Sequence, residues 1–174
     1  FMQKPFWKST KSKKLQKDFI EVCKSASMVG IKDIVIPLVD NGRLENSYQY
    51  EFLIDYLLSQ KAFFSDKKIR ILFESDFDPS ELRIFISKLP EDNFGINYDI
   101  GNSAALNYDS DEEFLNYGDR ILNIHIKDRL KGGNTIALGN GNVDFQKVFK
   151  NIVNIKYRGN FILQTARAED NNHL

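Results

Sequence analysis

Four polar residues each stand at the end of an apolar segment of the sequence, and their side chains are of the types that bind divalent metal ions. They are Glu74, Asp99, His125 and Gln164, in this order along the chain. Two carboxylates, an imidazole and an amide oxygen form a suitable ligand set for one ion such as Mn²⁺, Mg²⁺, Co²⁺ or Zn²⁺. Any one of them alone would be read as a polar group satisfied at a strand end. Because all four occupy the same inward-facing position at the end of a predicted strand, the pattern favours a metal site.

The segment 121–128 predicts the buried strand that carries the histidine. Alternation along a strand puts Asn123, His125 and Lys127 on one face and three apolar side chains on the other. Lys127 is therefore a candidate catalytic residue that stabilises charge on a substrate oxygen or orients a ligand. An ion pair with a carboxylate is the alternative for this lysine.

Predicted strands and helices alternate along the chain, which is typical of an α/β fold with a parallel sheet. Helix starts are marked by Asp78 before Pro79, by a capping box that opens at Ser110, and by Asp144, while Gly30 ends the first helix. In parallel α/β folds the carboxyl ends of the strands form the functional edge, which is where the four candidates fall. The predicted helices cover residues 13–28, 47–61, 78–89, 110–118 and 144–153, and the predicted strands cover 31–39, 69–74, 94–99, 121–128, 135–138 and 160–166.

Composition limits the classes of partner. The chain has 174 residues and a net charge of zero, with 24 basic and 24 acidic residues. Neither sign is gathered on one element, so no nucleic-acid partner is expected, and the basic stretch 8–17 is interpreted as a solvated helix start. No apolar run is long enough to span a membrane, and the first residues do not resemble a signal peptide. The single cysteine, Cys23, lies on an apolar helix face and is expected to be a buried structural thiol, which fits a reducing, cytoplasmic location.

Five motifs occur in a characteristic order: Leu-Phe-Glu ending at Glu74, Tyr-Asp-Ile-Gly-Asn at 98–102, His-Ile-Lys-Asp at 125–128, Leu-Gly-Asn-Gly-Asn-Val-Asp-Phe at 138–145, and Tyr-Arg-Gly-Asn-Phe-Ile-Leu at 157–163. Together they resemble the successive motifs of the xylose-isomerase-like TIM barrel family of sugar and sugar-phosphate isomerases and epimerases. The resemblance extends from about Gly30 to the end of the chain. It implies a (β/α)8 barrel, present as an incomplete barrel of about strands 3 to 8. Residues 1–174 would form one such domain, without its first two strand–helix units and its last helix.

The resemblance also implies roles for the candidate residues. Glu74, Asp99 and His125 match the first three metal ligands of the family, and Gln164 stands where the family has a glutamate. Family epimerases use two glutamates on opposite faces of the substrate, so Gln164 argues against two-base epimerisation. A one-base isomerisation by 1,2-proton transfer through an enediolate, with Glu74 as the base, remains available. The expected substrate is a small sugar or sugar phosphate.

Three further residues are predicted to contact the substrate: Asn102, Asp128 and Arg167. Asn102 either hydrogen-bonds a sugar hydroxyl or shapes the loop after the third of these strands. Arg167 could hold a phosphate or carboxylate through its planar guanidinium group, as could Arg129, with a solvated loop arginine as the alternative for each. The second histidine, His173, is expected in a disordered polar tail.

Other functions are weighed against the isomerase. The apurinic endonucleases on the same fold have a histidine where this chain has Asn102, which argues against DNA repair. A metal-dependent dehydratase or lyase needs one base and tolerates Gln164. A non-catalytic ligand-binding barrel, or a piece that works only with a partner chain, predicts no bound metal. Assembly into a homo-oligomer is left open.

Overall fold

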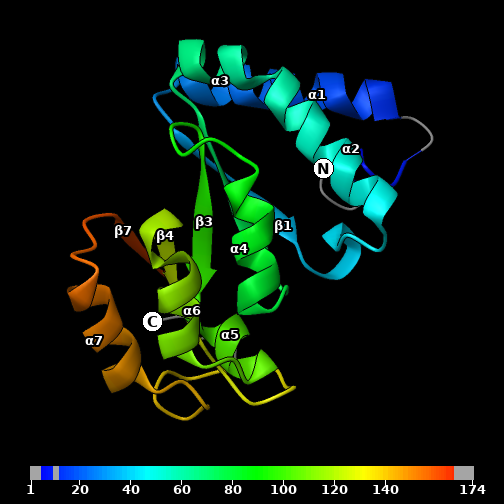
Figure 1. Ribbon diagram of the computed structural model, residues 1–174. Helices are drawn as coiled ribbons and strands as arrows, with labels where there is room; N and C mark the ends of the chain where they lie inside the picture. The colour runs from blue at the N-terminus through cyan, green and yellow to red at the C-terminus, as the bar shows by residue number, and fades with distance from the viewer. Residues whose placement is uncertain (1–4, 10–11, 167–174) are drawn as a thin grey trace. The chain divides into compact units, whose positions relative to one another are not determined.

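The computed structural model describes residues 5–9 and 12–166. Within them, five parallel strands form one sheet in the order β1-β2-β3-β4-β7, and two short strands, β5 and β6, form a separate antiparallel pair. Figure 1 labels β1, β3, β4 and β7 of this sheet. The described part of the sheet is a partial barrel that is not closed. The predicted α/β fold with a parallel sheet is confirmed. The elements are α1 (Ser12–Met28), β1 (Asp33–Leu38), η1 (Asp40–Gly42), α2 (Ser47–Ser59), α3 (Lys61–Lys67), β2 (Arg70–Ser75), α4 (Pro79–Ser87), β3 (Phe94–Asp99), α5 (Ile100–Leu106), α6 (Ser110–Tyr117), η2 (Gly118–Arg120), β4 (Ile121–Ile126), β5 (Asp128–Arg129), β6 (Thr135–Ile136), α7 (Phe145–Asn154) and β7 (Asn160–Leu163).

The chain divides into two compact units, and each has its own core. Both are built from strands and the helices that follow them in sequence. The first unit comprises Phe1–Ser75 with Ile84–Ile96, and the second comprises Asp76–Arg83 with Asn97–Leu174.

In the first unit, β1 and β2 pair in parallel with Val35 opposite Leu72. The apolar run of β2 is buried because both faces of the strand are covered. The ring of Phe73 packs edge-on against Phe85 at a centroid distance of 4.9 Å, and Phe64 packs in the same way against Phe94 at 5.8 Å. This aromatic core holds the strand that ends with Glu74 and Ser75 in place.

In the second unit, β4 pairs in parallel with β7, and His125 lies opposite Ile162. The ring of Tyr98, on the outward face of β3, packs edge-on against Phe114 of α6 at 5.2 Å. Helix α7 lies beside α6 and buries Ile152. These contacts fix the strands whose ends carry Asp99 and His125.

Helix caps follow the sequence signals, with one exception. Asp78 Oδ1 accepts the backbone N–H of Glu81 at 2.9 Å, and Asp144 Oδ1 accepts that of Lys147 at 3.0 Å. Gly30 has a φ of +80° and follows α1, as predicted. The cap of α6 is Asp109 and not Ser110, because the Asp109 carboxylate accepts the N–H of Asp111 at 2.8 Å.

Two α-helices were not predicted. The predicted helix 47–61 ends at Ser59, and a separate helix, α3, follows it. Helix α5 begins directly after β3 in a stretch with a glycine and an asparagine, which have low helix propensity. It forms because Asp99 caps it and Asn107, with a φ of +61°, ends it.

Four predicted strands are shorter in the structure, namely those predicted at 31–39, 121–128, 135–138 and 160–166. Strand β4 ends at Ile126 and β7 ends at Leu163, so Lys127 and Gln164 lie just beyond the strands that were expected to carry them. Cys23 is fully buried, as expected. Among the described residues, no helix combines the length and the apolar character that a membrane crossing requires.

Candidate metal centre at the ends of β3 and β4

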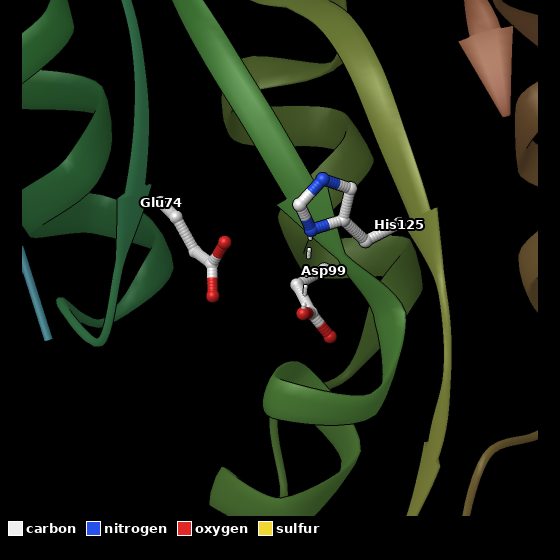
Figure 2. Close-up of side chains that lie close together, drawn as sticks. All are labelled: Glu74, Asp99 and His125. Atoms are coloured by element: carbon white, nitrogen blue, oxygen red, sulfur yellow. Dashed lines mark ion pairs between the residues drawn. The ribbon is translucent and has the colours of Figure 1, made fainter. Parts of the chain in front are cut away.

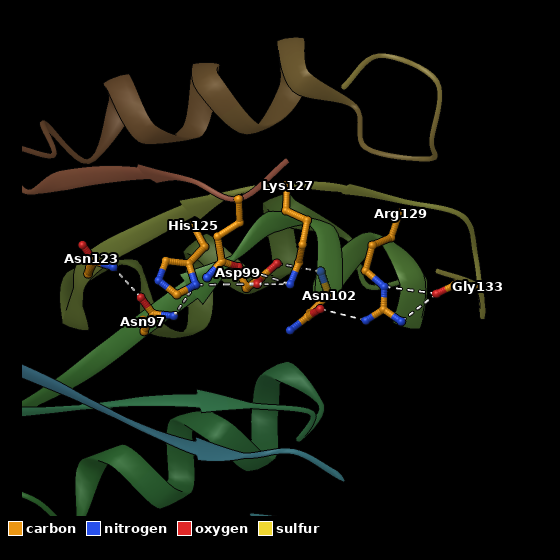
Figure 3. A network of polar contacts seen from close by, with 9 residues as sticks. Asn97, Asp99, Asn102, Asn123, His125, Lys127, Arg129 and Gly133 are labelled. Carbon is orange, nitrogen blue, oxygen red and sulfur yellow. Dashed lines mark hydrogen bonds and ion pairs between the residues drawn. The ribbon is translucent and has the colours of Figure 1, made fainter. Parts of the chain in front are cut away.

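Asp99 is the last residue of β3, and both of its carboxylate oxygens are engaged. Oδ1 accepts the backbone N–H of Asn102 at 2.9 Å and so caps α5. Oδ2 lies 2.6 Å from the ammonium nitrogen of Lys127 (Figure 3). The Asp99 side chain is 1 % exposed, so this ion pair is shielded from water. A buried carboxylate with a fixed orientation is a suitable metal ligand.

The surroundings of Asp99 favour its charged form. Burial by itself raises the pKa of this carboxyl group, and it is the largest single influence. Contacts with His125 and Lys127, the charge of Lys127 and the N–H of Asn102 together outweigh burial, so the pKa of Asp99 lies below its usual value. Asp99 is therefore a carboxylate at neutral pH, which is the form that binds metal.

His125 lies on β4 with its ring directed toward β3. Its Nδ1 atom is 3.7 Å from Asp99 Oδ2 and 3.1 Å from the amide nitrogen of Asn97 (Figure 3). Asn123 Nδ2 in turn donates a hydrogen bond to Asn97 Oδ1. The imidazole is thus held by amide side chains on β3 and β4.

Glu74, Asp99 and His125 form a group that could hold a metal ion. One ligand atom from each residue lies within 4.8 Å of the others, and Figure 2 shows the three side chains together. Asp99 Oδ2 is buried and accepts no hydrogen bond within the described part of the chain, although Lys127 lies beside it. Two carboxylates and an imidazole suit Mn²⁺, Co²⁺ or Zn²⁺, so these residues fit a divalent ion.

Gln164, the predicted fourth ligand, lies just after β7 and is exposed. Its backbone N–H donates to the carbonyl oxygen of Ile126 at 2.9 Å, which holds it beside the end of β4. Its side-chain oxygen is 3.5 Å from Lys127 Nζ, the same ammonium group that pairs with Asp99. Lys127 thus links Asp99 and Gln164. The ligand role of Gln164 and the catalytic role of Lys127 remain predictions.

Asn102 and Arg129 contact each other. Arg129 Nη1 donates to Asn102 Oδ1 at 2.8 Å, and Arg129 Nε and Nη2 donate to the carbonyl oxygen of Gly133 (Figure 3). The guanidinium group therefore ties the start of α5 to the loop after β5. These contacts agree with the alternative in which Asn102 shapes the loop after β3. Its contact with a substrate remains a prediction.

Asp128, another predicted substrate contact, is fully buried. Its carboxylate accepts three backbone N–H groups, from Gly139 at 2.9 Å, Gly141 at 2.9 Å and Val143 at 3.2 Å. Gly141 has to be glycine, because a Cβ there would collide with Asp128 Oδ1. Asp128 organises the loop 137–143, and its substrate contact stays a prediction. Arg167 and His173 lie outside the described residues.

Sequence reasoning missed two polar clusters. Asn97 and Asn123 were visible as in-phase residues, but nothing in the sequence showed that their amides bond to each other and to His125. Glu113 was assigned only to a capping box, yet it is buried and accepts the hydroxyl groups of Tyr98 and Tyr117, each at 2.7 Å. The signal for this second cluster was the pair of tyrosines on apolar faces.

Comparison with solved structures gives the same fold. A xylose isomerase domain protein from Planctomyces limnophilus is similar with a TM-score of 0.78 and 19 % identity, over 92 % of this chain and 62 % of that one. L-ribulose 3-epimerase gives a TM-score of 0.77 and 14 % identity, over 97 % and 60 %. The IOLI protein with a binding zinc atom gives 0.76 and 16 %, over 91 % and 63 %. The chain therefore spans 60 % to 63 % of the length of these three structures.

Comparison with curated proteins gave no match. A family model described as xylose isomerase-like TIM barrel matches residues 7–173, which is nearly the whole chain. The match includes all the elements that position Glu74, Asp99 and His125. The chain belongs to the xylose isomerase-like TIM barrel family.

Proposed function

We propose that the protein containing this chain is a metal-dependent isomerase of a small sugar or sugar phosphate. The observation that carries the proposal is the group formed by Glu74, Asp99 and His125, with ligand atoms within 4.8 Å of one another. The family membership and the similarity to an L-ribulose 3-epimerase and to a zinc-containing structure support it.

The ligands and the base have distinct roles in the proposed reaction. Glu74, Asp99 and His125 hold the ion, with Gln164 as a further oxygen donor. A bound divalent ion supplies Lewis acidity that polarises the substrate carbonyl group. Asp99 enters the reaction already charged, because its surroundings lower its pKa.

Glu74 moves the proton in this scheme. Its carboxylate takes the proton from the carbon that bears the hydroxyl group and returns it to the neighbouring carbonyl carbon, while the hydroxyl proton passes between the two oxygens. Lys127 donates a hydrogen bond to the oxygen that becomes negative. No oxidant or water is consumed, so the products are isomers of the substrate.

A test of the proposed isomerase uses a panel of aldoses, ketoses and their phosphates with Mn²⁺ in deuterated water. We expect interconversion of one aldose–ketose pair with deuterium incorporated next to the carbonyl. Glu74→Gln should lower kcat by about 100-fold or more, the usual contribution of a general base. Glu112→Gln, an exposed glutamate of α6, is the matched control and should retain activity. Full activity of Glu74→Gln would rule out the mechanism.

A metal-dependent dehydratase or lyase is the second candidate. Gln164 is compatible with it, since an amide cannot serve as a second base and these reactions need only one. The same incubation separates the two reactions, because a dehydratase product has lost water and a lyase product has lost a carbon fragment. The mass of the product decides between them.

A further inference from the structure

We propose that a cavity between α5, α6 and the start of α7 binds a small neutral molecule with several neighbouring hydroxyl groups, such as a monosaccharide or a sugar alcohol. The cavity has a volume of about 360 Å³, near the lower end of the range of about 300–1,000 Å³ for small-molecule sites. It lies within the second unit. The described residues that line it do not include Glu74, Asp99 or His125, so it is separate from the candidate metal centre.

The walls of the cavity are held in place by contacts within the chain. Lys147 joins two helices, because its ammonium nitrogen is 2.6 Å from Asp109 Oδ1 at the start of α6 and its backbone N–H donates to Asp144, the cap of α7. In the loop before α7, Asn142 Oδ1 accepts the backbone N–H of Lys131 at 2.7 Å. The cavity is therefore formed before a ligand arrives, which keeps the ordering cost of binding low.

Glu113 supplies a buried acceptor. This residue is 1 % exposed and lines the cavity. Its Oε1 atom accepts the hydroxyl groups of Ser103 and Tyr117, and its Oε2 atom accepts that of Tyr98, each at 2.7 Å. A carboxylate oxygen has two acceptor positions. Within the described part of the chain, Oε2 therefore keeps one position for a ligand hydroxyl group.

The lining also offers donors and an apolar surface. The ammonium group of Lys131 and the side-chain NH₂ groups of Asn107 and Asn142 have no hydrogen-bond partner among the described residues. Ala104 and Val148 present apolar side chains to the same space, where the C–H groups of a sugar can pack. The proposed isomerase reaction gives the motif that contains Asn142 no role, whereas this cavity does.

The charges of the lining favour a neutral ligand. Three carboxylates, those of Asp109, Glu113 and Asp144, disfavour an anion, and the ammonium groups of Lys131 and Lys147 disfavour a cation. A hydroxyl group has no charge, and it both donates and accepts hydrogen bonds. A molecule with several adjacent hydroxyl groups can therefore bond to the carboxylates, the ammonium groups and the amides together.

The test is a titration of the chelator-treated 174-residue chain with D-xylose, D-glucose, xylitol and myo-inositol, followed by ¹H–¹⁵N NMR. Removal of metal prevents a sugar from binding through an ion at the candidate metal centre. At least one of the four compounds should cause shifts that saturate in the millimolar range or below. The shifts should be centred on the backbone N–H groups of Ser103, Glu113 and Asn142. Saturating shifts centred on His125 instead would overturn the proposal.

Two variants locate the binding site. Ala104→Leu fills the cavity and should abolish the saturating shifts, whereas Ala62→Leu, the same change on an exposed site of α3, should bind as the wild type does. Lys131→Met removes an exposed donor without entering the core, and it should weaken binding about tenfold, the usual loss for a hydrogen bond to a charged group. Lys150→Met, on the exposed face of α7, should not weaken it.

Inorganic phosphate and methylammonium serve as the charged comparison ligands, and neither should displace the bound polyol. Absence of saturation with all four compounds, unchanged affinity in Ala104→Leu and Lys131→Met, or tighter binding of either ion would overturn the proposal. The cavity does not depend on the proposed function. A chain that binds a polyol in the cavity but binds no Mn²⁺ would contradict the isomerase and support the cavity site.

Discussion

The ammonium nitrogen of Lys127 lies 2.6 Å from Oδ2 of Asp99, and the two side chains are 14 % and 1 % exposed. A carboxylate this deeply buried needs a nearby positive charge, because removing it from water is costly. Lys127 supplies that charge in the metal-free chain. The candidate metal site is thus balanced electrostatically before any ion binds.

Lys127→Met should lower the free energy of unfolding of the metal-free chain by about 3 kcal/mol, because it leaves a buried carboxylate unpaired. Urea unfolding measures this loss. Adding Mn²⁺ should stabilise the variant more than the wild type, since the ion replaces the missing charge. Lys150→Met, on the exposed face of α7, is the control. Equal stability of Lys127→Met and wild type would show that the ion pair contributes nothing.

Asp128→Asn should loosen the loop 137–143, because an amide cannot accept all three of the N–H groups that Asp128 now binds. Each lost bond to a charged acceptor is worth about 1.5–3 kcal/mol. Hydrogen exchange at Gly139 and Gly141 should accelerate by about tenfold or more. Asp119→Asn, an exposed partner of Arg83, should leave these rates unchanged. Unaltered exchange in Asp128→Asn would contradict the assigned role.

Glu113 makes stability depend on pH. Burial raises the pKa of its carboxyl group, and the hydroxyl groups of Ser103, Tyr117 and Tyr98 offset only part of this rise. The folded chain therefore binds this proton more tightly than the unfolded chain does. The stability that proton binding by Glu113 contributes is complete below the ordinary pKa of 4.5 and is lost as the pH rises through the pKa of the folded chain.

Glu113→Gln keeps a neutral side chain at every pH. Its stability relative to wild type should therefore increase as the pH rises above about 4.5. Thermal unfolding across this range measures the difference, and Glu112→Gln provides the exposed control. A stability difference between Glu113→Gln and wild type that stays constant or shrinks with rising pH would contradict the raised pKa of Glu113.

Cys23 should not react with iodoacetamide in the folded chain at mildly alkaline pH. Burial raises the pKa of its thiol to about 12, so almost no thiolate is present. Mass spectrometry should detect alkylation only after unfolding in guanidinium chloride. Rapid alkylation of the folded chain would mean that the first unit opens around α1.

The strands were predictable because their apolar runs reflect burial on both faces, which is a local property of the sequence. Asp99 was placed at the end of its strand correctly, since β3 spans the predicted residues 94–99. The phase of His125 and Asn123 along β4 followed from alternation alone.

Contacts between elements could not be derived in this way. Nothing in the sequence showed that Asp99 would begin a helix, because the stretch after it has weak helix propensity and depends on the Asp99 cap. The sequence also did not show that Asp128 would accept backbone N–H groups that follow it by 11 to 15 residues. Such pairings depend on how the chain folds back, which residue spacing does not encode.

Metal binding by the chelator-treated chain tests the central claim most directly. Titration calorimetry with Mn²⁺ should give one ion per chain. Asp99→Asn and His125→Gln should each weaken binding by about 100-fold or more, since even outer partners of a metal ligand contribute about 10-fold to 100-fold. Asp109→Asn, an exposed carboxylate of the same unit, should bind as the wild type does. Absence of binding by the wild type, or equal binding by all four proteins, would contradict the account.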